Sequence, residues 1–107
     1  MSEWVTVATR AELLAGGMLA VKFGSYDLAL YDVGGEIFAT DNLCTHAQAY
    51  LTDGTLAGDV VECPLHGGRF EVKTGKGLGP PIPCDLKTYP VRVHDGEIQL
   101  SLPEVFS

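Results

Sequence analysis

The sequence is poor in positive charge: 7 lysines and arginines stand against 14 aspartates and glutamates, and the formal net charge is -7. Such a chain would be repelled by the phosphate backbone of DNA or RNA, so we expect no nucleic acid partner. The acidic surface either serves solubility alone or steers docking onto a basic partner surface, and composition does not separate these two interpretations.

Long apolar runs and a disulfide framework are also missing. No stretch approaches the roughly 18 apolar residues of a membrane-spanning helix, so we expect no membrane anchor. The apolar stretch 13–21 follows Glu3 and Glu12 and has no basic leader, so we expect no signal peptide. Three cysteines are an odd number, and two of them belong to the site described below. We therefore expect no disulfide framework and a cytoplasmic location.

Glycine and proline are abundant, with 13 and 6 among 107 residues, while 46% of the residues are hydrophobic. This composition predicts a single folded domain, residues 1–107, that is rich in turns and mostly β. One short helical turn is expected at 11–14, where Thr9 is a candidate cap and Gly16-Gly17 ends the turn.

Alternating apolar residues predict strands at both ends of the chain. Strands at 19–23, 26–33 and 36–40 are separated by glycine turns and should form an antiparallel meander. Strands at 88–94 and 97–102 flank Asp95-Gly96, a favoured dipeptide for a tight hairpin turn. The middle segment, about 41–85, offers only short strand candidates at 59–62 and 69–72. We interpret it as a subdomain inserted into a base made of residues 1–40 and 86–107.

Two cysteine-histidine pairs lie in that middle segment. Cys44 and His46 form the first pair, and after sixteen residues Cys63 and His66 form the second. Thiolate and imidazole bind zinc or iron-sulfur centres, and four such ligands can close one site. Zinc fingers usually separate their cysteines from their histidines, whereas each pair here mixes the two, which suits a dinuclear centre. Both a structural zinc site and an iron-sulfur site remain open on these residues.

The ligand segments C-T-H and C-P-L-H-G-G-R-F, with G-L-G-P-P-I-P and K-T-Y-P-V, cover much of the chain. In these motifs the sequence resembles the Rieske-type 2Fe-2S ferredoxins of bacterial aromatic-ring-hydroxylating dioxygenase systems. The resemblance implies an all-β Rieske fold, in which a cluster-binding subdomain of two loops is inserted into an antiparallel β sandwich or barrel-like base. It also implies one 2Fe-2S cluster per chain, with Cys44 and Cys63 on the inner iron and His46 and His66 on the outer iron.

By the same resemblance, the chain is expected to be an electron-transfer component and not an enzyme. It would carry one electron at a time from a flavin-dependent ferredoxin reductase to a terminal oxygenase. The chain has no dinucleotide-binding G-x-G-x-x-G motif, which leaves catalysis to its partners. Two alternatives are a Rieske-like small subunit of another reductase, such as nitrite reductase, and a structural zinc module.

Several positions suggest how such a cluster would be tuned. High-potential Rieske proteins carry a disulfide and hydroxyl donors near the cluster; the matching positions here hold Ala49, Leu65, Gly68 and Phe70. The resemblance therefore predicts a reduction potential at the low end of the Rieske range.

Other residues near the loops have expected roles of their own. We expect the backbone amides around Gly67 and Gly68 to approach the cluster sulfurs. The prolines within 80–83 should stiffen a covering loop. Cys84 and His94 are expected to lie outside the ligand set.

Overall fold

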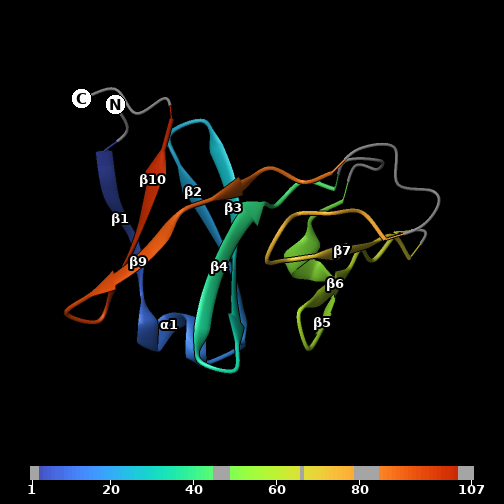
Figure 1. Cartoon of the computed structure of the whole chain (residues 1–107), viewed down its shortest axis with the longest axis horizontal. Coiled ribbons are helices and arrows are strands. Elements are labelled where there is room, and N and C mark those ends of the chain that lie inside the picture. The colour runs from blue at the N-terminus through green and yellow to red at the C-terminus, as the bar shows by residue number, and fades with distance from the viewer. Residues whose placement is uncertain (1–2, 45–48, 66, 79–84, 104–107) are drawn as a thin grey trace.

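The computed structural model describes residues 3–44, 49–65, 67–78 and 85–103, and within them the strands form three antiparallel sheets (Figure 1). The first sheet has the order β1 (Glu3–Thr9), β10 (Glu97–Leu102), β9 (Val91–His94). The second has the order β2 (Met18–Phe23), β3 (Tyr26–Val33), β4 (Glu36–Asp41), β8 (Thr88–Tyr89). The third contains β5 (Thr55–Ala57), β6 (Val60–Glu62) and β7 (Arg69–Glu71). The prediction of an all-β antiparallel fold is confirmed.

A single turn of helix, α1 (Arg10–Leu14), links the first two sheets, one residue longer than predicted. Thr9 caps it: the Glu12 N–H donates to the Thr9 hydroxyl at 3.2 Å, and the Thr9 N–H donates to the Glu12 carboxylate at 2.9 Å. These hydrogen bonds stabilise the carboxylate and lower the pKa of Glu12. The cap aims the fully buried Leu13 between the sheets.

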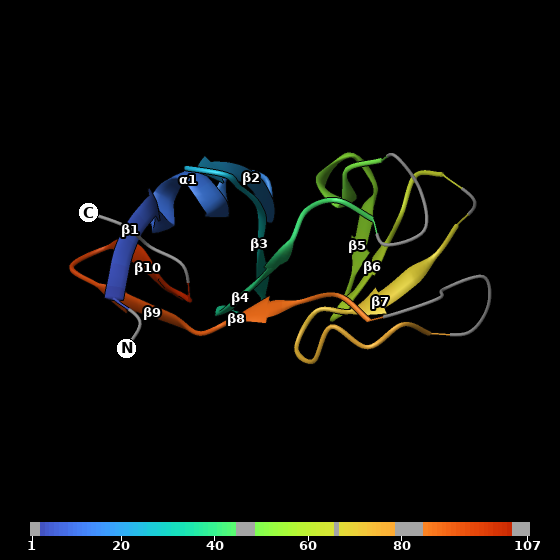
Figure 2. The ribbon, with the colours of Figure 1, turned by 90° about the horizontal axis from the view of Figure 1, so that it is seen from above.

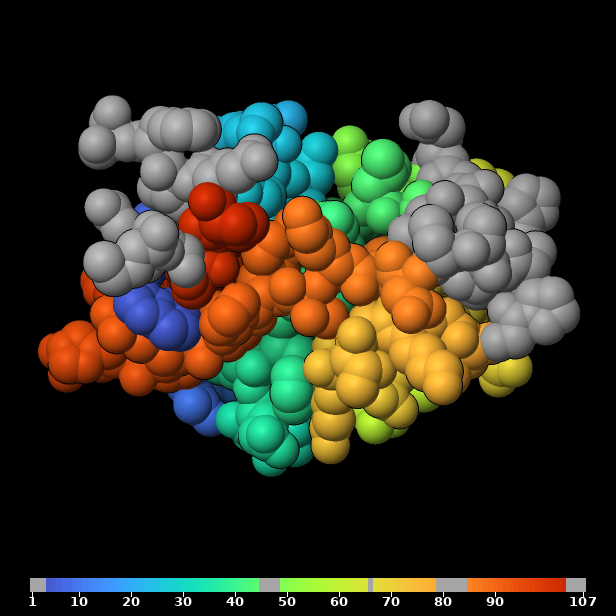
Figure 3. All heavy atoms as spheres, turned by 45° about the horizontal axis from the view of Figure 1, so that its top comes forward, coloured from blue at the N-terminus to red at the C-terminus, as the bar shows by residue number. Residues whose placement is uncertain are grey.

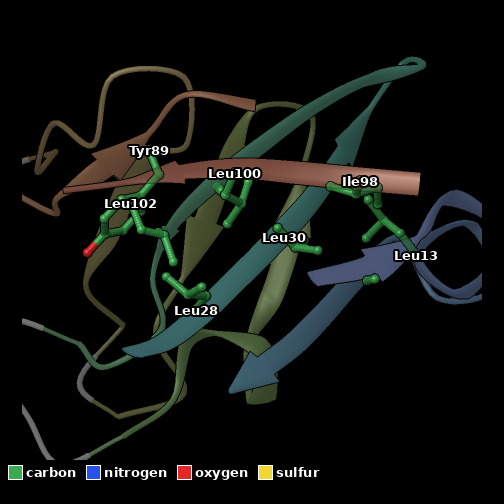
Figure 4. Close-up of a cluster of buried hydrophobic side chains, with 9 residues drawn as sticks. Leu13, Leu28, Leu30, Tyr89, Ile98, Leu100 and Leu102 are labelled. Atoms are coloured by element: carbon green, nitrogen blue, oxygen red, sulfur yellow. The ribbon is translucent and has the colours of Figure 1, made fainter. Parts of the chain in front are cut away.

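The first hydrophobic core lies between the first and second sheets. In Figure 4, Leu28 and Leu30 of β3 point toward the leucines and isoleucine of β10. Leu28, Leu30, Ile98, Leu100 and Leu102 are all fully buried. Burial of one such side chain contributes about 1.5–3 kcal/mol, so this layer is a main source of stability for the sandwich.

β3 is buried on both of its faces, unlike the other long strands. Leu28 and Leu30 face the first core, whereas Ala29 and Tyr31 belong to a second core on the other side. This explains why four consecutive residues of a strand with period-two side-chain alternation are apolar and buried. β3 therefore separates the two hydrophobic cores and contributes side chains to both.

The second core lies between β3 and the third sheet. It contains Leu51, Val61, Phe70, Val72 and Leu86 together with Cys44 and Cys63. Figure 2 shows the third sheet on the far side of β3 and β4 from β1 and β10. The middle segment of the chain thus has an apolar core of its own, to which β3 contributes Ala29 and Tyr31.

The closing strands differ from the prediction, because the expected strand 88–94 is divided at Pro90. Proline has no N–H to donate to a ladder, and here its carbonyl accepts from the Ser101 N–H at 3.1 Å. Tyr89 consequently pairs with Ala39 of the second sheet, while Val91 pairs with Leu100 of the first. The 3-10 turn η1 (Leu51–Asp53) and the strand β5 were not predicted. The hairpin at Asp95-Gly96 is confirmed, with φ of 50° and 77° at its two central residues.

Two segments connect the base sheets to the third sheet, and they run side by side. The Asp41 N–H donates to the Lys87 carbonyl at 3.0 Å where the chain leaves and returns. Beyond this point, the Leu86 N–H donates to the Gly75 carbonyl at 2.7 Å. Figure 3 shows the returning segment, in orange, packed against the segment that follows β7, in gold.

Of the helices in the described part of the chain, none is long and apolar enough to cross a membrane.

Candidate metal centre

The first predicted ligand loop starts at the end of β4 and is held at its base by Asn42. The Asn42 side-chain amide donates to the Thr52 hydroxyl and accepts from the Thr52 N–H, both at 3.0 Å. Leu43 and Tyr50 then form an antiparallel bridge, and inside it the Cys44 N–H donates to the Ala49 carbonyl at 2.8 Å. Cys44 is therefore the first residue of a loop that closes on itself five positions later.

The second predicted ligand loop is built in the same way. Glu62 of β6 pairs with Arg69 of β7, and inside this pair the Cys63 N–H donates to the Gly68 carbonyl at 2.6 Å. Gly67 within the loop has a φ of 66°, a left-handed conformation that glycine adopts without steric cost. Both cysteines thus occupy the same place, the first residue after a closed antiparallel pair.

The two cysteines lie in one apolar cluster. Cys44 is 4% exposed and Cys63 is 1% exposed, and both belong to the core that contains Leu51, Val61 and Phe70. A buried thiolate is costly unless a metal or a hydrogen bond compensates its charge. Two cysteine sulfurs presented from matched loops within an apolar cluster are suited to a metal centre, because sulfur is a preferred soft ligand.

The structure tests only part of the predicted ligand set. His46 and His66 lie outside the described residues, as do Cys84 and the prolines of 80–83. Among the described residues, no group of three cysteine, histidine or carboxylate side chains that could hold a metal ion occurs. His94 lies on the closing hairpin with its side chain 72% exposed, and its Nε2 is 3.4 Å from the Asp95 carboxylate.

Behind the first loop, buried polar groups join β3, β4 and β8. The Thr40 hydroxyl donates to the Asp41 carbonyl at 2.8 Å, which leaves the Tyr31 hydroxyl to donate to Thr40 at 2.9 Å. Burial raises the pKa of Tyr31 to about 12. The Tyr89 hydroxyl donates to the Asp41 carboxylate at 2.5 Å, and burial together with this carboxylate raises the pKa of Tyr89.

Sequence reasoning missed these supporting residues. Asn42 precedes the first loop by two positions, but nothing local indicates that its amide reaches Thr52 across η1. Similarly, the Tyr89–Asp41 hydrogen bond joins residues 48 positions apart. A polar residue flanking a ligand motif was the one available signal.

Fold and loops together define a small antiparallel β protein that presents two buried cysteines from paired loops. The model of the Rieske [2Fe-2S] domain family matches residues 3–90. The chain therefore belongs to the Rieske [2Fe-2S] family, its cofactor is a 2Fe-2S cluster, and the zinc alternative is rejected. The donor chemistry fits, because two of the four Rieske ligands are cysteine thiolates.

Several similar proteins are ferredoxins or ferredoxin components of dioxygenase systems. The ferredoxin component of the naphthalene 1,2-dioxygenase system of Pseudomonas putida is 46% identical over 100 residues, which cover 94% of this chain and 96% of that protein. The solved Sphingomonas yanoikuyae B1 ferredoxin has a TM-score of 0.88 and 41% identity, covering 94% of this chain and all of the other. A solved complex of reduced oxygenase and oxidized ferredoxin in carbazole 1,9a-dioxygenase matches with a TM-score of 0.85 and 38% identity, covering 94% of each chain.

Proposed function

We propose that this protein is the electron-carrying ferredoxin of a multicomponent aromatic-ring dioxygenase system. It accepts single electrons from a flavin-dependent ferredoxin reductase and delivers them to a terminal oxygenase. When bound, the 2Fe-2S cluster supplies the one-electron redox chemistry. The observation that carries this proposal is the pair of matched, cysteine-bearing loops beside exposed apolar side chains. Relatives named as ferredoxin components of dioxygenase systems support the choice of partners.

We assign the ligands as Cys44 and Cys63 on one iron and His46 and His66 on the other. The matched placement of the two cysteines supports the first half of this assignment. The histidines follow the cysteines within the same loop segments, two positions later in the first loop and three in the second. A Rieske centre requires this division of thiolate and imidazole ligands between its two irons.

The chain's own residues would keep water from the cysteine side of the site. Leu51, Val61 and Phe70 are fully buried around the two cysteines, so the sulfur atoms are covered from the interior. A dry surrounding raises the cost of adding negative charge, and it therefore favours a low reduction potential. A cytoplasmic location is proposed on the small, odd number of cysteines, three in the chain.

The same end of the molecule offers a surface for partner proteins. Leu43, Tyr50 and Leu65 flank the two loops and are 44%, 45% and 43% exposed. The carboxylates of Asp53 and Glu62 are exposed close to the loops in sequence. Apolar contact area with charges around it is typical of transient interfaces, in which charge steers approach and apolar burial holds the complex. We propose that both the reductase and the oxygenase dock here.

The test is reconstitution with a reductase and an oxygenase of a naphthalene-type system, with substrate-dependent NADH oxidation as the readout. Leu65→Ala should raise the KM for the ferredoxin roughly fivefold, since about 1 kcal/mol of apolar burial is lost at the interface. Val93→Ala is the matched control, because Val93 is 40% exposed but lies on β9, outside the loops. Absence of electron flow with the wild-type protein would refute the proposed function. Equal effects of the two substitutions would refute the docking surface.

A further inference from the structure

Gly54 occupies a place where no side chain fits. A methyl group added at this position would lie 1.9 Å from the Glu62 carbonyl oxygen, 3.0 Å from its carbonyl carbon and 3.2 Å from the Leu51 carbonyl oxygen. All three neighbours are backbone atoms, so a side-chain rotation cannot relieve the contact. The backbone of Gly54 has a φ of -90° and a ψ of -148°. The close approach of the Glu62 carbonyl to this position calls for glycine here.

The atom that Gly54 approaches belongs to the second ligand loop. The Glu62 carbonyl is part of the peptide bond to Cys63, and the N–H of that same peptide donates to Gly68 at 2.6 Å. A peptide group is planar, so displacement of the Glu62 oxygen also reorients the Cys63 N–H. A side chain added at Gly54 would consequently displace the backbone at Cys63.

On its other side, Gly54 is joined to the first ligand loop. The Gly54 N–H donates to the Leu51 carbonyl at 2.9 Å, and the Leu51 N–H donates to the Asn42 carbonyl at 2.8 Å. The Asn42 side chain makes two further hydrogen bonds to Thr52. Asn42 precedes Cys44 by two residues and is only 4% exposed. A continuous series of short backbone contacts thus runs from Cys44 through Gly54 to Cys63.

We propose that Gly54 is a positioning residue that sets the separation of the Cys44 and Cys63 loops and so the geometry of the cluster site. The inference rests on the proposed role of the two cysteines as ligands. Well-packed interiors do not deform continuously, so one added methyl displaces a neighbouring backbone segment as a unit. Here the displaced segment is the start of the Cys63 loop.

The test uses the full-length holoprotein with Gly54→Ala, and Gly16→Ala as the matched control. An added methyl at Gly16 would meet only the Met18 carbonyl, at an ordinary 3.6 Å. We measure iron and labile sulfide per chain, the visible circular dichroism and EPR spectra of the cluster, and iron release to a chelator. Gly54→Ala should shift both spectra and release iron roughly tenfold faster, the fold-change expected for overpacking. Gly16→Ala should match the wild type.

Fluorescence of Trp4, the single tryptophan, reports whether the base has folded, independently of the cluster. If Gly54→Ala does not fold, Thr52→Val loosens the same connection by removing the acceptor of the Asn42 amide. A smaller spectral shift in Thr52→Val then supports the inference, and wild-type spectra overturn it.

Cys63→Ala separates this inference from the assignment of the ligands. A cluster retained in Cys63→Ala overturns both. A cluster lost in Cys63→Ala, with wild-type spectra in Gly54→Ala, overturns only the role of Gly54. Equal changes in Gly54→Ala and Gly16→Ala also overturn it.

Discussion

Replacing Tyr31 by phenylalanine should change stability in opposite directions at neutral and at alkaline pH. The ring is fully buried in the core that contains both cysteines, and its hydroxyl donates to Thr40 at 2.9 Å. Tyr31→Phe removes this hydrogen bond but keeps the ring, so it should cost about 1 kcal/mol at pH 7. For a domain of this size that lowers the unfolding temperature by about 4–8 °C.

At high pH the buried phenol lowers the stability of the folded state. Burial raises the pKa of Tyr31 from 10.0 to about 12, so the folded state resists an ionisation that the unfolded state undergoes. The full stability is therefore present below pH 10 and is lost as the pH rises from about 10 toward 12. Linkage gives a loss of about 1.4 kcal/mol by about pH 11. Phenylalanine does not ionise, so the variant is spared this loss.

The assay is thermal unfolding from pH 7 to about pH 11.5, followed by Trp4 fluorescence and by the visible absorbance of the cluster, with linkage setting the range. The unfolding temperatures of the wild type and Tyr31→Phe should cross at about pH 10.7, where the alkaline loss equals the cost of about 1 kcal/mol for the missing hydrogen bond. Tyr50→Phe, at a ring that is 45% exposed, is the control for removal of a surface phenol. If Tyr31→Phe stays below the wild type at every pH, the reasoning is refuted.

Four further predictions concern the cluster and its partners. The purified protein should contain about two irons and two labile sulfides per chain. Alanine at any proposed ligand should abolish cluster assembly; the proposed ligands are Cys44, His46, Cys63 and His66. His94→Ala, on the closing hairpin, should keep the visible spectrum, and its loss there would contradict the assignment. The reduction potential should lie below about 0 mV, toward the low end of the Rieske range. Gly68→Ser and Phe70→Tyr should both raise it by offering hydroxyl donors beside the Cys63 loop; protein-film voltammetry measures this, and unchanged potentials despite formed hydrogen bonds would count against it. Rates of electron delivery should depend on ionic strength because the protein carries a formal net charge of -7, and flat stopped-flow rates across salt would assign that charge to solubility alone.

Much of the fold followed from local patterns. The strands Tyr26–Val33 and Glu97–Leu102 have the predicted bounds, because glycine or Asp-Gly turns mark their ends. Thr9 caps α1 as expected, and Glu12 completes a capping box between residues three apart. These elements are defined by interactions within a few positions of the chain.

Features that depend on distant partners were not predictable in this way. β1 pairs with β10 from the opposite end of the sequence, so no local signal shows its register. Gly54 resembles any turn glycine until the Glu62 carbonyl is brought against it by the fold. The sequence predicted that Cys44 and Cys63 would lie together because each pairs with a histidine in a short motif, and the structure places both cysteines in one core. The support of the candidate site by Asn42 and Thr52 depends on the path of η1 and was not visible.

The double burial of β3 limits how the gene can vary. Most sheet strands tolerate mutation at every second codon, since one of their faces meets water. At positions 28–31 neither face of the strand meets water. Leu28 and Leu30 pack in the first core, and Ala29 and Tyr31 pack in the core that contains the cysteines. Selection for better electron delivery and selection for a stable base therefore act on the same four codons. Improved variants should arise in the loops and at the surface, while this strand stays nearly invariant.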